Sequence, residues 1–486
     1  MTDTRRWPAR DERLQWMAIA VLTVIAIALR VYRLTEWSLH DDEYSTWKNS
    51  LELSWSNPRP LLFALNHYLV WPLFGLRELG LRLIPVTAGV VAVPAFYVML
   101  RRVNMGTEGL AAAALVAVST WHVYWSQFAR YYTLVFLLSA VCGLALLGWL
   151  RNRRGGWLGL AAASGVLATL AHPSALPVVG TGALIVGLNE YRNNRRLPLW
   201  SWALALGIGL IVAAVRYGPI IAYRSAYRES ACCHTGLPLA FSLLDWMTAP
   251  VLLCALVGMA LWWWTERGTM PLVVAACALI PTVLFIGMSE LMVVSLSYLF
   301  ATTPFYFLAA GWLIAHIARS APAQSRASLA YCGVAVAVVA SANLVGLASH
   351  FRDCGRLPYR DVANALPSLT GGRDTILAEG THLEFYLPQL PLGALPWDSL
   401  TLHGKVHQGG AAWVLVPRVD RAGFGYYERQ FAQVYTWVDG HCALVKVFTT
   451  PRLDFRRNAL ELFRCVPEVR PTALSGAATA AGAWSR

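Results

Sequence analysis

Long apolar segments separated by short polar ones run along most of the chain. The apolar segments last for about 17 to 25 residues, the length that a helix needs to cross roughly 30 Å of hydrocarbon. The first of them, residues 14–31, is too long for the core of a signal peptide. We therefore expect an all-α polytopic membrane protein with about eleven transmembrane helices. These would start near residues 14, 83, 109, 132, 156, 173, 199, 246, 270, 298 and 329.

Arginine clusters occupy every second connection between the apolar segments. The positive-inside rule places these connections and the N-terminus in the cytoplasm, and an odd number of spans puts the C-terminal region outside. The complementary loops, of which 34–82 is the first, would carry any chemistry done outside the cell. Within this loop Leu61–Phe74 is apolar but too short to span, which indicates an interfacial helix. The cytoplasmic arginines are Arg5, Arg6, Arg10, Arg13, Arg101, Arg102, Arg151, Arg153, Arg154, Arg192, Arg195, Arg196, Arg267, Arg319 and Arg326.

Composition supports a membrane protein and argues against a nucleic-acid-binding one. The chain is 57% hydrophobic and 14% charged, whereas a soluble domain has roughly 25% charged residues. The formal net charge of +13 comes mostly from the orientation signals, and no basic face or binding motif for nucleic acid is present. We expect membrane lipids as partners and no nucleic acid.

The composition changes near Pro358 to that of a small soluble domain. We expect a membrane domain at residues 1–348, a C-terminal α/β domain outside the cytoplasm at 349–468, and a disordered Ala-, Gly- and Ser-rich tail at 469–486. The α/β domain should contain a helix at Asp361–Leu369 and buried strands at Asp374–Glu379 and Ala412–Val416. A strand pair is expected at Val434–Val438 and Ala443–Phe448.

Nine cysteines form no Cys-x-x-Cys pair and no zinc-type spacing with histidine, so we expect no cysteine-based metal site. Cys232, Cys233 and Cys354 fall in segments assigned to the non-cytoplasmic side, as do Cys442 and Cys465. Disulfides persist in that compartment. Of the pairings that the sequence leaves open, we predict Cys442 with Cys465.

The acidic run Asp41, Asp42 and Glu43 directly follows the first span. Three adjacent carboxylates repel one another, and such a cluster can supply a general base. The same run could instead be a solvated loop that caps a helix beginning near Tyr44, because Asp favours N-cap positions. Spacing alone leaves both interpretations open.

The aromatic segment Trp121–Tyr132 contains Arg130 at the outer junction of the third and fourth spans. An arginine at membrane depth is costly unless it meets an anion, so Arg130 is a candidate ligand for a lipid-linked phosphate. The alternative is an aromatic belt with a snorkelling arginine. One active site can use Asp42 and Arg130 together only if they lie within about 15 Å, because catalytic groups must reach one bound substrate.

Three further positions in the outer connections could carry chemistry. His172 lies between two closely spaced spans and Glu290 near the outer end of the ninth. Either could join the acidic cluster around Mg²⁺ or Mn²⁺, with Asp42, Glu43 and His172 as the candidate set, and either could be purely structural. The loop after the seventh span, which includes Arg224, could receive a phosphate or sugar, or bind anionic lipid headgroups.

Taken together, these features resemble the membrane glycosyltransferases of GT-C fold in family 39, which includes protein O-mannosyltransferases and bacterial lipid A aminoarabinose transferases. The resemblance covers about residues 14 to 318. It rests on Asp42-Glu43, Arg82-Leu83-Ile84-Pro85-Val86 through Pro94 to Arg101-Arg102, Ser126-Gln127-Phe128-Ala129-Arg130-Tyr131, His172, and Tyr298-Leu299 through Pro304.

The resemblance implies an inverting transfer of a sugar from a polyprenyl-phosphate donor at the periplasmic face of a bacterial inner membrane. It assigns the base to Asp42, with Asp41 as the neighbouring contender, and gives Glu43 a part in orienting or binding the acceptor. Arg130, with Tyr131 and Gln127, would hold the donor phosphate. His172, Arg224 and Tyr298 would contact substrate. No nucleotide is required.

The chain departs from the family pattern at Ser297, where many relatives carry an arginine before the tyrosine that opens the late span. The C-terminal domain resembles those of uncharacterised bacterial members, which favours a lipid, glycan or cell-envelope acceptor over protein O-glycosylation. A transporter or flippase of lipid-linked sugars is the rival from another class. It would be expected to carry ionisable or helix-breaking residues near the midplane of several spans. A structural partner of another envelope protein is a third interpretation.

Overall fold

A computed structural model describes residues 9–194, 216–219, 221–222, 225, 235–320, 325–352, 356–370, 374–378, 382–409, 412–419, 425–450 and 458–465. The chain divides into two compact units. The first comprises residues 1–356 with 451–456, and the second residues 357–450 with 457–486. Arg224, Cys232, Cys233, Cys354, the span expected near residue 199 and the tail 469–486 lie outside the described residues.

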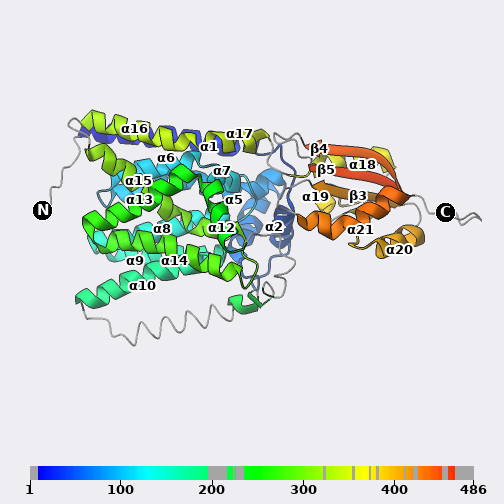
Figure 1. Ribbon diagram of the computed structural model, residues 1–486, viewed down its shortest axis with the longest axis horizontal. Coiled ribbons are helices and arrows are strands. Elements are labelled where there is room, and N and C mark those ends of the chain that lie inside the picture. Colours follow the sequence, from blue (N-terminus) through cyan, green and yellow to red (C-terminus); the bar gives the residue numbers. More distant parts are fainter. Residues whose placement is uncertain are drawn as a thin grey trace, which may run out of the picture. The chain divides into compact units, whose positions relative to one another are not determined.

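The first unit is built from long helices that run along a common direction (Figure 1). A helix lies at every expected span position in the described part of the chain, and the count of eleven spans stays a prediction. Five of these helices are long and apolar enough to cross a membrane, or six if the bent pair 333–341 and 344–352 is one span. The chain is a multi-pass membrane protein. The long helices are α1 (Ala9–Val31), α5 (Glu78–Arg101), α6 (Gly106–Val118), α8 (Tyr132–Asn152), α9 (Gly155–Ala171), α10 (Ala175–Asn194), α13 (Ala249–Glu266), α14 (Thr269–Ser289), α15 (Thr303–Ser320) and α16 (Ser325–Ser341).

Short helices occupy the connections and carry most of the candidate residues. In the first loop, residues 60–74 are helical throughout, which confirms the short helix expected there; its interfacial position stays a prediction. Tyr68, Leu73 and Phe74 on it are exposed. The short elements of this unit are α2 (Asp41–Leu51), α3 (Pro60–Leu65), η1 (Asn66–Val70), α4 (Trp71–Phe74), α7 (Thr120–Ser126), α12 (Leu237–Met247), η3 (Leu296–Ala301) and α17 (Leu344–Arg352).

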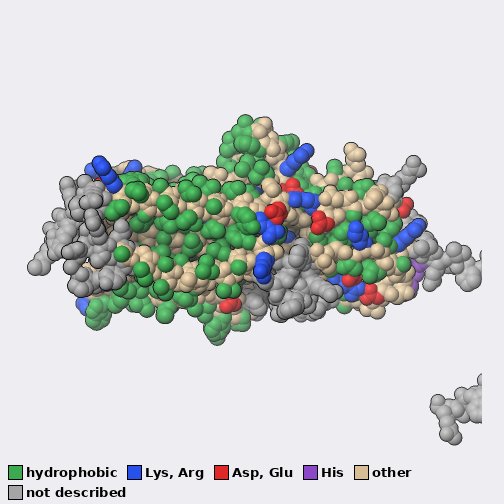
Figure 2. Space-filling view, turned by 90° about the horizontal axis from the view of Figure 1, so that it is seen from above, with side chains coloured by type: hydrophobic (Ala, Val, Ile, Leu, Met, Phe, Trp, Pro, Cys, Tyr) green, Lys and Arg blue, Asp and Glu red, His purple; other side chains and the backbone are tan. Residues whose placement is uncertain are grey.

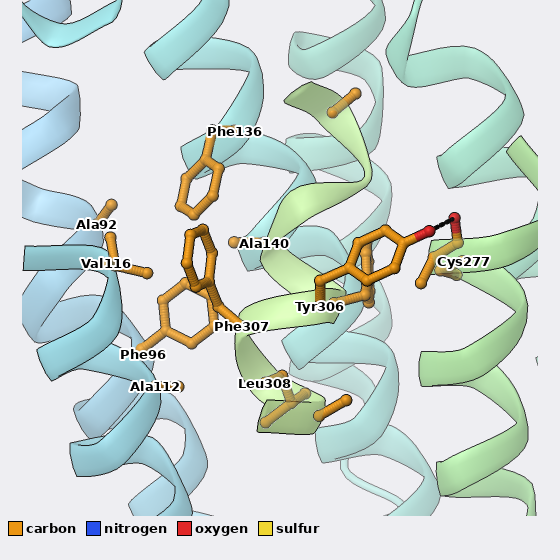
Figure 3. Packing of buried hydrophobic residues seen from close by; sticks show 14 of the residues in the cluster. Ala92, Phe96, Ala112, Val116, Phe136, Ala140, Cys277, Tyr306, Phe307 and Leu308 are labelled. Atoms are coloured by element: carbon orange, nitrogen blue, oxygen red, sulfur yellow. Dashed lines mark hydrogen bonds between the residues drawn. The ribbon is translucent and has the colours of Figure 1, made fainter. Parts of the chain in front are cut away.

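Small residues let the helices of this unit approach closely, as is usual between membrane helices. Figure 3 shows Phe96, Phe136 and Phe307 meeting among Ala92, Ala112 and Ala140. The rings of Phe136 and Phe307 lie 6.1 Å apart, as do those of Phe96 and Phe136. On the face that Figure 2 shows, hydrophobic side chains are spread over most of the described helices. A dense core and an apolar surface together fit a bundle surrounded by lipid.

A substitution at Gly258 on α13 tests whether α13 and α15 need this close approach. A Cβ built there would lie 2.2 Å from the carbonyl oxygen of Ala309 on α15, so Gly258→Ala must push the two helices apart. We expect a loss of about 1–3 kcal/mol, as in other overpacked cores, seen as a lower melting temperature of the purified protein in detergent. Gly180→Ala is the matched control, because a Cβ there meets nothing within 4 Å. Equal melting temperatures of the two variants would contradict the packing argument.

The second unit is a mixed five-stranded sheet with strand order β2-β1-β3-β5-β4, which confirms the expected α/β class. Pairs β1–β2 and β1–β3 are parallel, whereas β3–β5 and β4–β5 are antiparallel. Along β3, Val414 and Val416 pack into one core and Trp413 and Leu415 into another, so both faces of the sheet are covered. The elements are α18 (Tyr359–Thr370), β1 (Ile376–Ala378), α19 (His382–Tyr386), β2 (Leu392–Ala394), α20 (Ser399–Gly409), β3 (Ala412–Val419), α21 (Gly425–His441), β4 (Ala443–Thr450) and β5 (Asn458–Cys465).

Two sequence predictions for this unit have opposite outcomes. The strand predicted at Val434–Val438 is wrong, because these residues belong to α21. Phe431, Val434 and Val438 are buried at spacings of three and four, so one helix face contacts the sheet. β4 pairs instead with β5. The disulfide predicted between Cys442 and Cys465 is confirmed.

Candidate active site

The acidic run forms the first turn of α2, and its cap is His40. The imidazole Nδ1 of His40 accepts from the backbone N–H of Asp42 at 3.3 Å, and Glu43 Oε2 accepts from the backbone N–H of His40 at 3.0 Å. This reciprocal pair is a capping box. The helix therefore begins at Asp41 rather than near Tyr44, and its N-cap is not an Asp. Only the backbone of Asp41 belongs to the described atoms.

Glu43 is fully buried, and five donors surround its two oxygens. Oε1 accepts from Arg82 Nε at 2.9 Å and from the backbone N–H of Ala129 at 2.7 Å. Oε2 accepts from Arg82 Nη2 at 3.0 Å, from Arg356 Nη1 at 2.8 Å and from His40. Burial alone would raise the pKa of this carboxyl, but Arg356 and Arg82 outweigh it and lower the pKa to about 2. A carboxylate with all these donors holds its neighbours in place. The part of Glu43 in orienting or binding the acceptor stays a prediction.

Asp42 and Arg130 form an ion pair, so the proximity expected of a shared site is present. Asp42 Oδ1 lies 2.9 Å from Arg130 Nη2; the Asp42 side chain is 47% exposed and that of Arg130 only 8%. Arg130 Nη1 also donates to the backbone oxygen of Asp42 at 3.0 Å. The Asp42 side chain is therefore accessible to a substrate from solvent, whereas the Arg130 side chain lies behind it and is buried.

A second arginine, which the sequence did not reveal, faces the same point. Arg59 Nη1 donates to Tyr131 Oη at 2.5 Å, and Arg130 Nη2 donates to it at 3.3 Å. Burial alone would raise the pKa of Tyr131, but the two guanidinium groups lower it. Arg59 stands between Pro58 and Pro60, which restrict the backbone on both sides. The two flanking prolines were the only feature of the local sequence that set Arg59 apart.

Among the described side chains, this cluster carries more positive than negative charge. Arg130 pairs with the carboxylate of Asp42, and Arg59 lies beside Arg130 at Tyr131. The Nε atoms of Arg59 and Arg130 are buried, and within the described residues neither has a hydrogen-bond partner. Arg216 is a third cation near the loop of Arg59, since its Nη2 donates to the backbone oxygen of Asn57 at 3.0 Å. Buried donors and surplus charge suit an anion such as phosphate.

His172 and Tyr298 belong to the aromatic wall of this cluster. The imidazole of His172 stacks on Tyr131 with centroids 4.6 Å apart and an interplanar angle of 19°. Tyr298 lies 4.8 Å from the same imidazole. His172 Nδ1 lies 2.8 Å from Ser174 Oγ, which fixes the ring orientation. The structure thus brings both predicted residues to Tyr131.

Gln127 does not reach the cluster. Its Nε2 donates to the backbone oxygens of Leu29, Arg30 and Tyr32 at the end of α1. Its Oε1 lies 2.7 Å from His350 Nε2. Protein groups thus occupy both ends of the buried amide, which ties α1 to the turn 127–131. The contact of Gln127 with donor phosphate stays a prediction.

Arg30 holds the segment that leads into the turn 127–131. The break between α6 and α7 leaves the last carbonyls of α6 without helical donors, and Arg30 donates to the backbone oxygens of Val116 and Ala117 at 3.0 Å each. Its Nε also reaches Ser126 Oγ at 3.2 Å. Gly89 makes room for this arrangement, because a Cβ there would lie 2.2 Å from Ser126 Oγ.

The candidate metal set Asp42, Glu43 and His172 does not converge on one point. In the described part of the chain, no group of three or more His, Cys, Asp or Glu side chains could hold a metal ion. Arginines surround Glu43, and Asp42 pairs with Arg130. As they are placed, these three residues do not form a Mg²⁺ or Mn²⁺ site.

No family model matches the sequence, and no curated protein matches it significantly. Solved structures do match. ArnT from Cupriavidus metallidurans bound to undecaprenyl phosphate aligns with a TM-score of 0.56 and 15% identity over 93% of this chain and 98% of that one. The archaeal oligosaccharyltransferase AglB from Archaeoglobus fulgidus, in complex with an inhibitory peptide and a dolichol-phosphate, aligns with a TM-score of 0.55 and 11% identity over 84% of this chain and 70% of that one. The chain shares the GT-C fold of these membrane enzymes.

Proposed function

We propose that the protein is a membrane glycosyltransferase that moves a sugar, with inversion, from a polyprenyl-phosphate donor to a lipid, glycan or cell-envelope acceptor. Reaction at the periplasmic face of a bacterial inner membrane, with a cytoplasmic N-terminus, is part of this proposal. The observation that carries it is the ion pair of Asp42 and Arg130 beside Arg59 and Tyr131. Solved structures of the same fold with undecaprenyl phosphate and dolichol-phosphate support it.

The charge of the cluster suits the leaving group of such a transfer. A polyprenyl-phosphate sugar is a phosphodiester with one negative charge, and the departing phosphate monoester gains a second. Donors aimed at the place where charge develops stabilise the transition state more than the ground state. Arg59 and Arg130 offer buried guanidinium donors at one point, so they are the groups assigned to this charge.

Asp42 is the proposed base. The acceptor hydroxyl oxygen forms a bond to the anomeric carbon of the sugar while the bond from that carbon to the phosphate oxygen breaks. The bonding electron pair leaves with the phosphate, and the hydroxyl proton passes to the Asp42 carboxylate. The products are the glycosylated acceptor and polyprenyl phosphate. Attack from the face opposite the leaving group gives inversion.

The ion pair of Asp42 and Arg130 suggests how donor binding would release the base. Asp42 and the donor phosphate compete for the same guanidinium group, Nη2 of Arg130, which now lies 2.9 Å from Asp42 Oδ1. When phosphate takes over Arg130, the carboxylate loses its partner and can accept a proton. Donor binding and activation of the base are then one event.

Binding of polyprenyl phosphate, the expected product, tests this site directly. We expect Arg130→Gln to weaken its binding about 10- to 100-fold, because a hydrogen bond to a charged group contributes about 1.5–3 kcal/mol. Inhibition of transfer by added polyprenyl phosphate is the measurement. Arg77→Gln, an exposed arginine at the start of α5, should leave the inhibition constant unchanged. An equal effect of both variants would contradict a specific phosphate site at Arg130.

The reaction itself needs two measurements on the wild-type chain. Purified protein should transfer sugar from a polyprenyl-phosphate donor and not from a nucleotide sugar. Mass spectrometry of envelope lipids and glycans from a deletion strain should then identify the missing sugar and its attachment point. Transfer from nucleotide sugars alone, or transport without transfer, would overturn the proposal.

A further inference from the structure

Arg356 is a buried arginine outside the predicted site residues. It follows α17, and Leu357, where the second unit begins, is the next residue. Its side chain is only 2% exposed. Arg356 is buried beside the candidate site, yet it has no role in the transfer chemistry proposed above.

The guanidinium group of Arg356 contacts two segments that are distant in the sequence. In the first segment, Nη1 donates to Glu43 Oε2 at 2.8 Å and to the backbone oxygen of Ser38 at 3.2 Å. In the second, Nη2 donates to the backbone oxygen of Gln127 at 3.0 Å, and the group lies 4.9 Å from the centre of the Phe128 ring. One rigid, planar cation therefore spans both segments.

These two segments carry the two groups assigned to the chemistry. Asp42 is the residue before Glu43, and Arg130 follows Gln127 by three residues. Within the described residues, Arg82, the other arginine partner of Glu43, also donates to the backbone oxygens of Leu34, Trp37 and Ser38, all in the first segment. These described contacts of Arg82 hold the first segment to α5, whereas those of Arg356 link the first segment to the turn that carries Arg130.

We propose that Arg356 is a positioning residue that sets the spacing of Asp42 and Arg130 during sugar transfer. This inference rests on the proposed function. Its contacts with described residues run to Ser38, Glu43, Gln127 and Phe128, so Arg356 acts on Asp42 and Arg130 through these neighbours. Small errors of spacing matter, because a displacement of about 1 Å between reacting groups can lower a rate about 100-fold.

Two substitutions of Arg356 and one control test the proposal in the full-length purified protein. Arg356→Gln removes the charge and the fork of donors. Arg356→Lys keeps a charge beside Glu43, but one ammonium group cannot reproduce the planar fork of donors. The control is Arg352→Gln, since Arg352 is exposed in the last turn of α17.

We expect Arg356→Gln to lower kcat per folded molecule about 10- to 100-fold, and Arg356→Lys about 10-fold, with donor KM within about threefold of wild type. Arg352→Gln should match wild type. A purely structural role would lower the folded fraction and the melting temperature but leave kcat per folded molecule unchanged. If Arg356→Gln does not fold, the lysine variant decides.

The outcomes separate this inference from the proposed function. A wild-type chain without transfer from any polyprenyl-phosphate donor overturns the proposed function and this inference with it. An active wild type, with unchanged kcat per folded molecule in the Arg356 variants, overturns the inference alone. A fall in kcat at unchanged donor KM, absent from Arg352→Gln, supports it.

Discussion

Asp42→Asn should lower kcat for sugar transfer by about 10²- to 10⁴-fold, the range typical of removing a general base. The amide has nearly the shape of the carboxylate and can still accept from Arg130, so the protein should fold. It cannot take up the proton of an acceptor hydroxyl at neutral pH. Transfer from a polyprenyl-phosphate donor by purified protein, normalised to folded protein, is the measurement.

Binding of polyprenyl phosphate to the Asp42→Asn variant distinguishes a catalytic base from a residue that only pairs with Arg130. Removing the charge of Asp42 weakens its interaction with Arg130, which lies 2.9 Å away, so polyprenyl phosphate should bind as tightly as before or more tightly. A large loss of kcat with unweakened product binding is the signature of a lost base. Full activity in Asp42→Asn would show that Asp42 is not the general base.

Asp41→Asn separates the two adjacent aspartates. We expect its kcat to stay within a few-fold of wild type, because the described contacts place the Asp42 carboxylate against Arg130. If Asp41→Asn abolishes transfer and Asp42→Asn does not, the base is Asp41.

The sequence predicted the helical framework because a membrane helix must satisfy its backbone within one apolar segment. It failed at Val434–Val438, where β-branched residues favoured a strand. Burial at spacings of three and four shows the helix α21 instead. Such a short apolar run does not distinguish a strand from one face of a helix.

At the site, the sequence identified residues that stand beside one another in the first loop and the 127–131 turn. It could not assign the partners of each one. Asp42 and Glu43 are adjacent in the sequence, yet Asp42 is half-exposed and Glu43 is fully buried. The turn of α2 places them on different sides, and the buried one meets Arg82 and Arg356, which arrive from 39 and 313 residues away. Arg59 was missed for the same reason, because nothing near it in sequence reveals Tyr131.

Replacement of Glu43 by Gln should strongly destabilise the folded protein. It leaves Arg82 and Arg356 buried with no carboxylate between them, and breaking a buried ion pair typically costs about 3–5 kcal/mol. We expect a marked fall in the melting temperature of the detergent-solubilised protein. Glu36→Gln is the matched control, because Glu36 pairs with Arg33 at 54% exposure and exposed pairs contribute about 0–1 kcal/mol.

The pH dependence of the loss of stability in Glu43→Gln tests whether the negative charge of Glu43 is its cause. The pKa of Glu43 falls from its ordinary value of 4.5 to about 2 in the folded protein. A group whose pKa is lowered by folding stabilises the folded state fully above its unfolded pKa, and the contribution is lost as the pH falls through the folded pKa. The gap in melting temperature between wild type and Glu43→Gln should therefore be constant from about pH 6 to 8 and should narrow below about pH 4.5. A gap that persists unchanged to pH 3 would show that Glu43 stabilises the fold through its shape and hydrogen bonds rather than its charge.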